Sequence, residues 1–340
     1  MYTKINIIEE TNGFHLVSGK LYTFLNDIEK LCEFDDSGQL LWQTKRCGIF
    51  YRYYITPKQI LYYLDSSSKE LFIRDREEKQ VLKVEKINLN LTNRYCYYGN
   101  ILYSFEKENI ITYDLQKLFL TSIVEGRIEG RVGFIDKRSV VTKKYSCIYV
   151  YSKTGFFVLW QKDFSKLAEY IEVDGEEVLG DIRQLWSYNG YIMVLTQMFL
   201  FKLNSETGEV IQQQKLPAGF MGLCVNENKA YGCYGYHFIE IDLDTLGILS
   251  FKRMEYENYE GQELFTLMNK AVYHAGLVFH AVRLEGGSHC IGAIQPKTGE
   301  RIWLHPIGVN DINNIAFHNN KMFVHDIGST LHIFERNPKL

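Results

Sequence analysis

The feature that most constrains the fold of this chain is a repeat with a period of about forty residues. Eight short runs of alternating polar and apolar residues each end at a polar turn, and their last residues are 38 to 40 positions apart except at two places, where the spacing is 52 and 53. The runs are Lys30–Asp35, Glu70–Asp75, Ile110–Asp114, Cys147–Ser152, Phe199–Asn204, Phe238–Asp242, Cys290–Gln295 and Thr330–Glu335. Alternation with period two predicts strands, and four short strands per forty residues are typical of a β-propeller blade.

The repeat predicts an all-β, closed β-propeller of eight four-stranded blades, formed by residues 1–340 as one domain. Seven blades is the alternative, because the second and third units lack the Gly–Trp pattern described below, and a two-domain β-sandwich fits the even spacing less well. The last unit stops at Arg336 without a fourth strand, whereas Thr3–Glu9 is an extra strand before the first unit. We expect Thr3–Glu9 to complete the final blade, because closure of the ring removes open sheet edges.

A turn motif recurs between the expected third and fourth strands. Its clearest copy is Thr298-Gly299 followed four residues later by Trp303, and weaker copies keep the glycine with or without the tryptophan. Glycine tolerates the positive φ that such turns need, and a tryptophan buried between two sheets removes a large apolar area from water. The structural positions that this motif predicts are Trp42, Trp160, Trp303, Gly38, Gly155, Gly208 and Gly299.

The same motif carries a resemblance to a known family. Ala293, Gln295, Thr298, Gly299 and Trp303 occupy the positions of Ala-x-Asp-x-x-Thr-Gly-x-x-x-Trp, with Gln in place of Asp, so the segment resembles the tryptophan-docking motif of the PQQ-like, quinoprotein-type β-propeller superfamily. The resemblance implies that the Trp packs between adjacent blades and that the Thr-Gly turn joins the third strand to the fourth. Enzymes of that family hold a quinone and calcium in the axial channel, some beside a disulfide between adjacent cysteines. None of the seven cysteines here are neighbours and no calcium ligands cluster, so we expect the shape without a cofactor.

Bulk composition narrows the choice of partner and compartment. A formal net charge of −3 and a pI near 6.3 argue against nucleic acid or an anionic membrane as partner. The N-terminal twenty residues lack the continuous apolar core of a signal peptide. An odd number of cysteines without a Cys-x-x-Cys pair favours free thiols. We therefore expect a monomeric cytoplasmic protein.

The two breaks in the period predict insertions near 162–183 and 252–264, both of which precede an inner strand and therefore share one face of the ring. Phe164, Leu167, Ala168 and Ile171 fall at helical spacing, so a short amphipathic helix is expected. Acidic loops with interleaved tyrosines suit a basic protein partner. The alternative is that they are solvated loops. The expected contact residues are Glu169, Tyr170, Glu172, Asp174, Glu176, Glu177, Asp181, Glu255, Tyr256, Glu257, Tyr259 and Glu260.

Arginines recur in the other connections expected on that face. At the mouth of the axial channel they would hold an anionic ligand or an acidic side chain, or instead pair with carbonyls and carboxylates at the rim. The expected rim residues are Arg46, Arg52, Arg94, Arg131, Arg183 and Trp186.

No motif for catalysis or metal binding occurs. Nucleophile elbow, His-Glu-x-x-His, P-loop and dinucleotide fingerprints are missing from the sequence. Eight histidines lie after residue 236 without compact spacing, and even if His280 and His289 faced each other they would supply only two ligands. The sequence therefore favours a non-catalytic protein-binding propeller, such as an intracellular inhibitor, an immunity-type protein or a scaffold. The alternatives are a propeller enzyme, a lyase or hydrolase that acts on a glycan or small molecule in the axial channel, and a structural subunit of an assembly.

Overall fold

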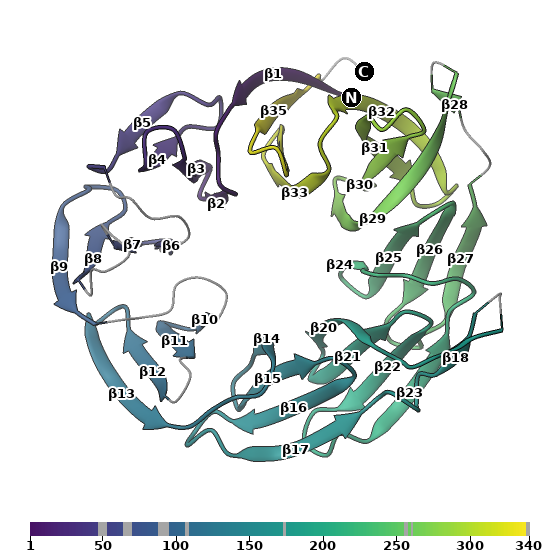
Figure 1. Cartoon of the computed structure of the whole chain (residues 1–340), viewed down its shortest axis with the longest axis horizontal. Coiled ribbons are helices and arrows are strands. Elements are labelled where there is room, and N and C mark those ends of the chain that lie inside the picture. The colour runs from purple at the N-terminus through teal and green to yellow at the C-terminus, as the bar shows by residue number, and fades with distance from the viewer. Residues whose placement is uncertain are drawn as a thin grey trace.

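The computed structural model describes residues 1–46, 53–63, 70–87, 95–105, 109–172, 175–254, 258–259 and 261–337. Within these ranges the chain is all-β, without a helix, and eight sheets of four main strands form a ring (Figure 1). The eight-bladed prediction is therefore confirmed, and the seven-bladed and sandwich alternatives are wrong.

Each blade is an antiparallel sheet whose four strands run outward from the axis in chain order. The strands of the first four blades are β2 (His15–Val17), β3 (Lys20–Leu25), β4 (Lys30–Phe34) and β5 (Leu40–Gln43); β6 (Tyr53–Ile55), β7 (Gln59–Tyr63), β8 (Glu70–Asp75) and β9 (Val81–Lys86); β10 (Tyr95–Tyr98), β11 (Ile101–Phe105), β12 (Asn109–Asp114) and β13 (Phe119–Glu125); and β14 (Arg131–Ile135), β15 (Ser139–Lys144), β16 (Cys147–Ser152) and β17 (Val158–Asp163). Those of the next three are β20 (Ile182–Tyr188), β21 (Tyr191–Thr196), β22 (Phe199–Asn204) and β23 (Val210–Lys215); β24 (Cys224–Asn226), β25 (Lys229–Tyr234), β26 (His237–Asp242) and β27 (Ile248–Arg253); and β29 (Gln262–His274), β30 (Leu277–Leu284), β31 (His289–Gln295) and β32 (Glu300–Gly308).

The eighth blade joins the two ends of the chain. It consists of β33 (Ile312–His318), β34 (Lys321–Asp326), β35 (Leu331–Arg336) and, as its outer strand, β1 (Tyr2–Ile8). Strand β1 pairs antiparallel with β35, from Tyr2 opposite Arg336 to Ile8 opposite Leu331, and Figure 1 shows the N-terminus beside this blade. The expected closure by the N-terminal strand is confirmed.

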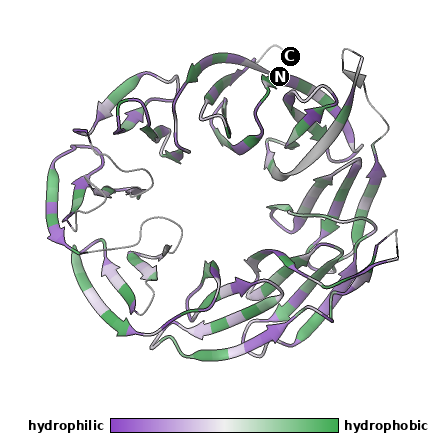
Figure 2. Cartoon of the chain, viewed as in Figure 1, coloured by the Kyte–Doolittle hydropathy of each residue, from purple (hydrophilic) through white to green (hydrophobic). Residues whose placement is uncertain are grey.

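Hydrophobic residues occur in every blade because the middle strands are covered on both faces by neighbouring blades (Figure 2). In β21, Val194 packs in one cluster with Val141 of blade 4, whereas the preceding residue, Met193, packs with Ala230 of blade 6. Outer strands are covered less, and β13 alternates between exposed and half-buried positions. In the described residues the core is therefore a series of interfaces between blades.

The turns between third and fourth strands lock each blade onto the previous one. Gly38, Gly155, Gly208 and Gly299 have φ angles of 88, 91, 73 and 69°, as expected for turn glycines. A Cβ on Gly208 would lie 2.7 Å from Cε3 of Trp160, which belongs to the outer strand of the preceding blade. The indole Nε1 of Trp160 donates to the carbonyl of Ser205 at 3.1 Å. Trp160 therefore docks on the turn of blade 5.

The docking position is filled by other nitrogen donors elsewhere in the ring. Asn6 in β1 donates through Nδ2 to the carbonyl of Ser37 at 2.8 Å, which joins blade 8 to blade 1. Lys83 donates to the carbonyl of Leu118, and Gln212 to that of Thr245, in the corresponding turns of blades 3 and 6. Blades without a tryptophan at this position thus keep the same contact, in which a side-chain N–H donates to a carbonyl in the turn of the following blade.

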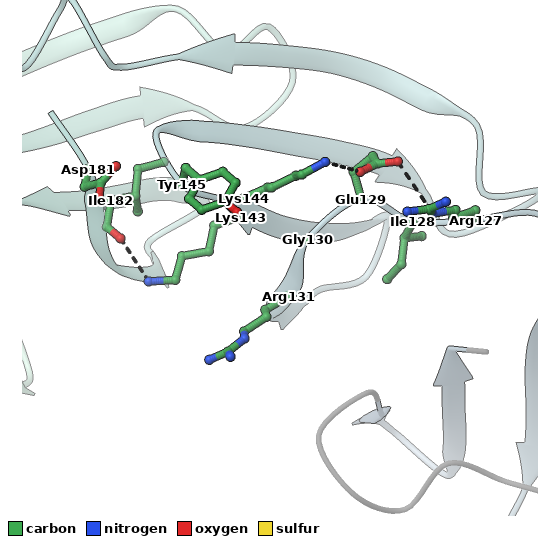
Figure 3. Close-up of a pocket in the computed structure, with 10 residues that line it drawn as sticks. All are labelled: Arg127, Ile128, Glu129, Gly130, Arg131, Lys143, Lys144, Tyr145, Asp181 and Ile182. Atoms are coloured by element: carbon green, nitrogen blue, oxygen red, sulfur yellow. Dashed lines mark hydrogen bonds and ion pairs between the residues drawn. The ribbon is translucent and has the colours of Figure 1, made fainter. Parts of the chain in front are cut away.

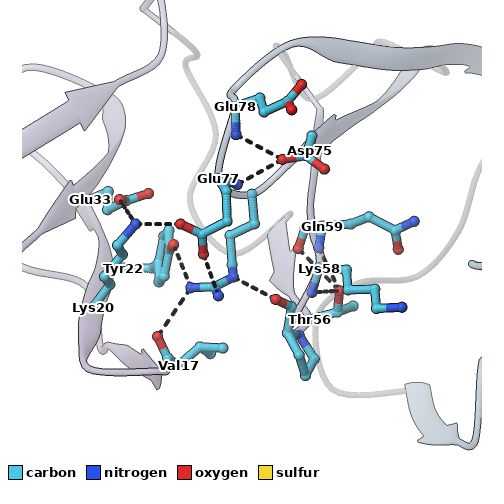
Figure 4. Close-up of polar contacts among 12 residues, drawn as sticks. Val17, Lys20, Tyr22, Glu33, Thr56, Lys58, Gln59, Asp75, Glu77 and Glu78 are labelled. Carbon is cyan, nitrogen blue, oxygen red and sulfur yellow. Dashed lines mark hydrogen bonds and ion pairs between the residues drawn. The ribbon is translucent and has the colours of Figure 1, made fainter.

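A polar network joins blades 1 and 2 (Figure 4). Arg76, whose side chain is 5% exposed, donates through Nε to the carbonyl of Pro57 at 2.7 Å. Its Nη1 lies 3.3 Å from both the Tyr22 hydroxyl and the Val17 carbonyl of blade 1. These contacts satisfy a guanidinium that would otherwise be costly to bury.

The neighbouring carboxylate of Glu33 in β4 is equally enclosed. Its side chain is 1% exposed, lies 3.5 Å from Nζ of Lys20 and forms an ion pair with Lys79. Lys79 comes from the turn between β8 and β9 of the next blade, so this pair is a second polar link between blades 1 and 2.

The first insertion does not contain the expected helix. A single turn, closed by a 2.9 Å bond from the amide of Ala168 to the carbonyl of Phe164, leads into a two-stranded hairpin of β18 (Tyr170–Ile171) and β19 (Glu177–Val178). The prediction was wrong because pairing of Tyr170 with Val178 uses the backbone groups that a longer helix would need. The second insertion contains β28 (Asn258–Tyr259), which pairs with the start of β29.

His280 and His289 lie on adjacent strands but are not paired with each other. His280 lies opposite Gly292 and His289 lies opposite Arg283, so the two rings do not face each other. His280 is fully buried, and its Nε2 has no hydrogen-bond partner among the described residues. Burial, together with the nearby charge of Arg301, holds the pKa of His280 well below its usual value.

We therefore expect acid to destabilise this protein in part through His280. A histidine whose pKa is depressed by folding is neutral in both states above its unfolded pKa of about 6.5. Below that pH the unfolded chain binds a proton that the native state does not bind, so the native state loses stability. Each proton bound only by the unfolded chain lowers the free energy of unfolding by about 1.4 kcal/mol per pH unit. Urea unfolding at pH 6.5 and 5.5 should show a smaller loss for His280→Met than for the native chain, and equal losses would contradict this prediction.

Candidate binding face

One face of the ring carries the loops that enter each inner strand and those that join second to third strands. We call it the insertion face, because the connections from β17 to β20 and from β27 to β29 both lie on it. Figure 1 shows the β18 hairpin and β28 at separate places along the rim. The two insertions therefore share a face of the ring but lie on different blades.

The first insertion is anchored to the ring. Phe164 is fully buried, and its ring meets that of Phe201 edge to face at a centroid distance of 5.1 Å. Ala168 is also fully buried, and Gly180 packs so closely on it that an added Cβ would lie 2.3 Å from the Ala168 Cβ. The hairpin between these anchors is therefore fixed at its base.

The hairpin exposes apolar side chains beside carboxylates. Ile171 is 69% exposed and Leu179 is 53% exposed. Glu172 and Glu177 are exposed on the same hairpin. Exposed apolar side chains bordered by polar ones are one feature of protein contact sites.

Tyr170 is placed differently from its predicted contact role. It is only 9% exposed, and its hydroxyl donates to Glu172 at 3.2 Å. Burial and the adjacent Glu172 raise the pKa of Tyr170. Because Tyr170 and Ile171 alternate across a strand, the buried tyrosine turns the isoleucine outward, and Ile171 is the exposed apolar side chain of this strand.

The remaining predicted contact residues fall into two groups. Glu169 forms a 2.7 Å ion pair with Lys166, and Glu176 and Asp181 are exposed. The predicted residues Asp174, Glu255, Tyr256, Glu257 and Glu260 lie outside the described residues, as does the side chain of Tyr259. The described part of the second insertion is held by a 2.7 Å hydrogen bond from the Tyr236 hydroxyl to Glu263.

Four of the six predicted rim residues lie in the part of the chain that the structure describes. Arg46 follows the outer strand β5 and forms an ion pair with Glu29, and Trp186 packs at the interface of blades 5 and 6. Arg52 and Arg94 lie outside the described residues. Arg131 and Arg183, which begin neighbouring inner strands, remain near the axis.

A cavity of about 460 Å³ lies on the insertion face between blades 4 and 5 (Figure 3). Three connections line it: the loop from β13 to β14, the turn from β15 to β16, and the start of β20. The lining residues are Arg127, Ile128, Glu129, Gly130, Arg131, Lys143, Lys144, Tyr145, Asp181 and Ile182. Sequence reasoning selected Arg131 but missed Lys143, because its position in an alternating strand gives no sign of a site.

Among the described residues, no group of three His, Cys, Asp or Glu side chains is arranged to hold a metal ion. In the same residues no helix has the length and apolarity needed to cross a bilayer.

Comparisons with known proteins identify the fold. No family model and no curated protein matches this sequence. Among solved structures, BamB from Moraxella catarrhalis superposes with a TM-score of 0.62 at 12% identity, over 98% of this chain and all of that one. The C-terminal WD40 domain of Sif2 gives 0.65 at 12% identity over 99% of each chain, and the computationally designed Ika8 protein gives 0.64 at 11% over 96% of each. The chain is a β-propeller.

At such low identity these neighbours establish the fold of the propeller alone. Two natural proteins and a designed one reach similar agreement, so ring geometry rather than a shared site accounts for the likeness.

Proposed function

We propose that this propeller binds another protein without catalysing a reaction, and that the partner presents a basic surface. The observation that carries the proposal is the anchored hairpin, on which exposed Ile171 and Leu179 lie among the carboxylates of Glu172 and Glu177. The apolar pair supplies area that is buried on contact, and the carboxylates attract and orient a cationic partner. An inhibitor or immunity-type protein that covers a basic effector is one form of this function, and a scaffold is another.

We further propose that the ring is of the PQQ-like, tryptophan-docking type. Docking of Trp160 on the turn of Gly208 supports this. Asn6 and Gln212 make the equivalent hydrogen bond to the turn of the next blade, which supports it as well. A cytoplasmic, monomeric protein remains our proposal, supported by the thiols of Cys147, Cys224 and Cys233, which form no disulfide.

The proposed partner site is tested by affinity capture from the source cells with quantitative mass spectrometry. We expect Ile171→Ser combined with Leu179→Ser to reduce capture of a basic protein by about tenfold, since tenfold corresponds to about 1.4 kcal/mol of lost contact energy. Ile211→Ser is the matched control, because Ile211 is also 53% exposed but lies on the outer strand β23. Unchanged capture by the double variant, or selective loss of an acidic protein, would contradict the proposal.

Charge is tested separately with Glu172→Lys combined with Glu177→Lys. Reversal of these charges should slow association with the captured partner and weaken its dependence on salt. Surface plasmon resonance at two salt concentrations measures both effects.

A further inference from the structure

The cavity between blades 4 and 5 is a cationic site in a protein whose net charge is −3. Four of its lining side chains are cations, and two are carboxylates. The cations are Arg127, Arg131, Lys143 and Lys144, and the carboxylates are Glu129 and Asp181. The excess of positive charge is local and differs in sign from the acidic hairpin beside it.

Only some of these charges neutralise one another. Glu129 lies 2.8 Å from Nζ of Lys144 and 3.7 Å from Nε of Arg127, so this carboxylate is shared by two cations. Figure 3 shows these three side chains together on one side of the cavity. Their pairing leaves Arg131 and Lys143 as the cations that face the rest of the space.

Lys143 is held in place by neutral groups. Its Nζ donates to the carbonyl of Ile182 at 3.0 Å and to that of Arg183 at 2.7 Å. Burial and the neighbouring charges of Arg183 and Arg131 lower its pKa. Two carbonyls orient the ammonium without cancelling its charge. Lys143 and Arg131 are therefore neighbouring cations, and Asp181 is the second carboxylate among the lining residues.

Arg131 lies opposite Lys143 in the pairing of β14 with β15, and its side chain extends from β14 away from Glu129 and Arg127 (Figure 3). It is exposed, and among the described residues no hydrogen bond or ion pair links it to the protein. The planar guanidinium presents paired N–H donors that match the two oxygens of an oxyanion.

Gly130 permits this arrangement. Its φ is +77°, and a Cβ there would lie 2.1 Å from the carbonyl oxygen of Lys143. Any side chain would therefore push apart the two connections that carry Arg131 and Lys143.

We propose that this cavity binds a small organic anion, with its carboxylate or phosphate group held between Arg131 and Lys143. A volume of about 460 Å³ is in the range of small-molecule sites, and an anion there would relieve the repulsion among Arg131, Lys143 and Arg183. The two cations that hold the anion, Arg131 and Lys143, lie outside the first insertion, although Asp181 of that insertion also lines the cavity, so their replacement tests the anion site apart from the hairpin.

Isothermal titration calorimetry with inorganic phosphate and, separately, citrate tests the site on the intact chain. We expect saturable millimolar binding of at least one probe by the native protein, and binding at least tenfold weaker to Arg131→Gln and to Lys143→Met. A stronger response to citrate identifies the carboxylate, and a stronger response to phosphate identifies the phosphoryl group. Because Arg131 is exposed, Arg131→Gln is expected to fold, which a thermal melt verifies.

Arg138→Gln is the matched control. Arg138 belongs to the same blade, is 79% exposed and lies in the turn from β14 to β15 on the opposite face, where it pairs with Glu206. Binding must be unchanged in this variant. Absence of saturable binding in the native protein, or equal weakening by Arg131→Gln and Arg138→Gln, would overturn the proposal. Neither result depends on whether the hairpin captures a partner.

Discussion

Replacement of Trp303 with alanine is expected to lower the free energy of unfolding by about 3 kcal/mol, near the lower end of the range for a buried tryptophan. Trp303 lies on the outer strand of blade 7, half-buried against the cluster that joins blades 7 and 8. Its ring centroid is 6.2 Å from that of Tyr2 and 6.3 Å from that of Phe279. Tyr2 begins the strand that closes the ring, so the lost contact is at the point where the two chain ends meet.

Ile302→Ala is the control for this prediction. Ile302 is the adjacent residue of the same strand and is 42% exposed, so its truncation removes less buried area. Denaturation with guanidinium, followed by circular dichroism and tryptophan fluorescence, should give a change of less than about 1 kcal/mol for Ile302→Ala. If both variants lost equal stability, Trp303 would not have the docking role that its contacts indicate.

Replacement of Lys79 with methionine is also expected to cost about 3 kcal/mol, because it leaves the carboxylate of Glu33 enclosed without its nearer partner. Glu33 is 1% exposed, and the remaining cation, Lys20, is 3.5 Å away. The Lys79 ammonium also lies 5.6 Å from the Trp42 ring centroid, so a cation–π contact is lost as well. Urea unfolding measures the change.

The double variant Glu33→Gln with Lys79→Met separates the buried charge from packing. Removal of the charge should restore part of the stability lost in Lys79→Met, since a neutral amide is less costly to bury than an unpaired carboxylate. Lys117→Met, at an exposed lysine in the corresponding turn of blade 3, should change stability by less than about 0.5 kcal/mol. A double variant less stable than the single one would show that the ion pair is not the cause.

The docking positions show how far sequence reasoning reaches into this fold. Trp160 was recognisable because a Gly and an aromatic residue recur at nearly constant spacing. Asn6, Lys83 and Gln212 have the same place in the ring but share only a side-chain N–H. Several residue types can donate a hydrogen bond to a backbone carbonyl. This contact therefore cannot be predicted from one recurring residue type in the repeat.

The insertion illustrates the opposite case. Helical spacing of Phe164, Leu167, Ala168 and Ile171 was real, yet these residues do not share one face. Phe164 and Ala168 are buried, whereas Leu167 and Ile171 are 41% and 69% exposed. In a segment this short, burial against the existing ring outweighs intrinsic periodicity.

The sequence by itself predicted the all-β class and the closure by the N-terminal strand, and it favoured eight blades over seven, because period-two alternation and a fixed repeat length are visible along the chain. The structure decided the number of blades. Only the tertiary structure decided which side chains meet across blades. Arg131 and Lys143 converge on one cavity, while Ile171 faces outward beside carboxylates. These arrangements depend on contacts between blades and on how an insertion packs on the ring. Neither produces a periodic pattern in the sequence.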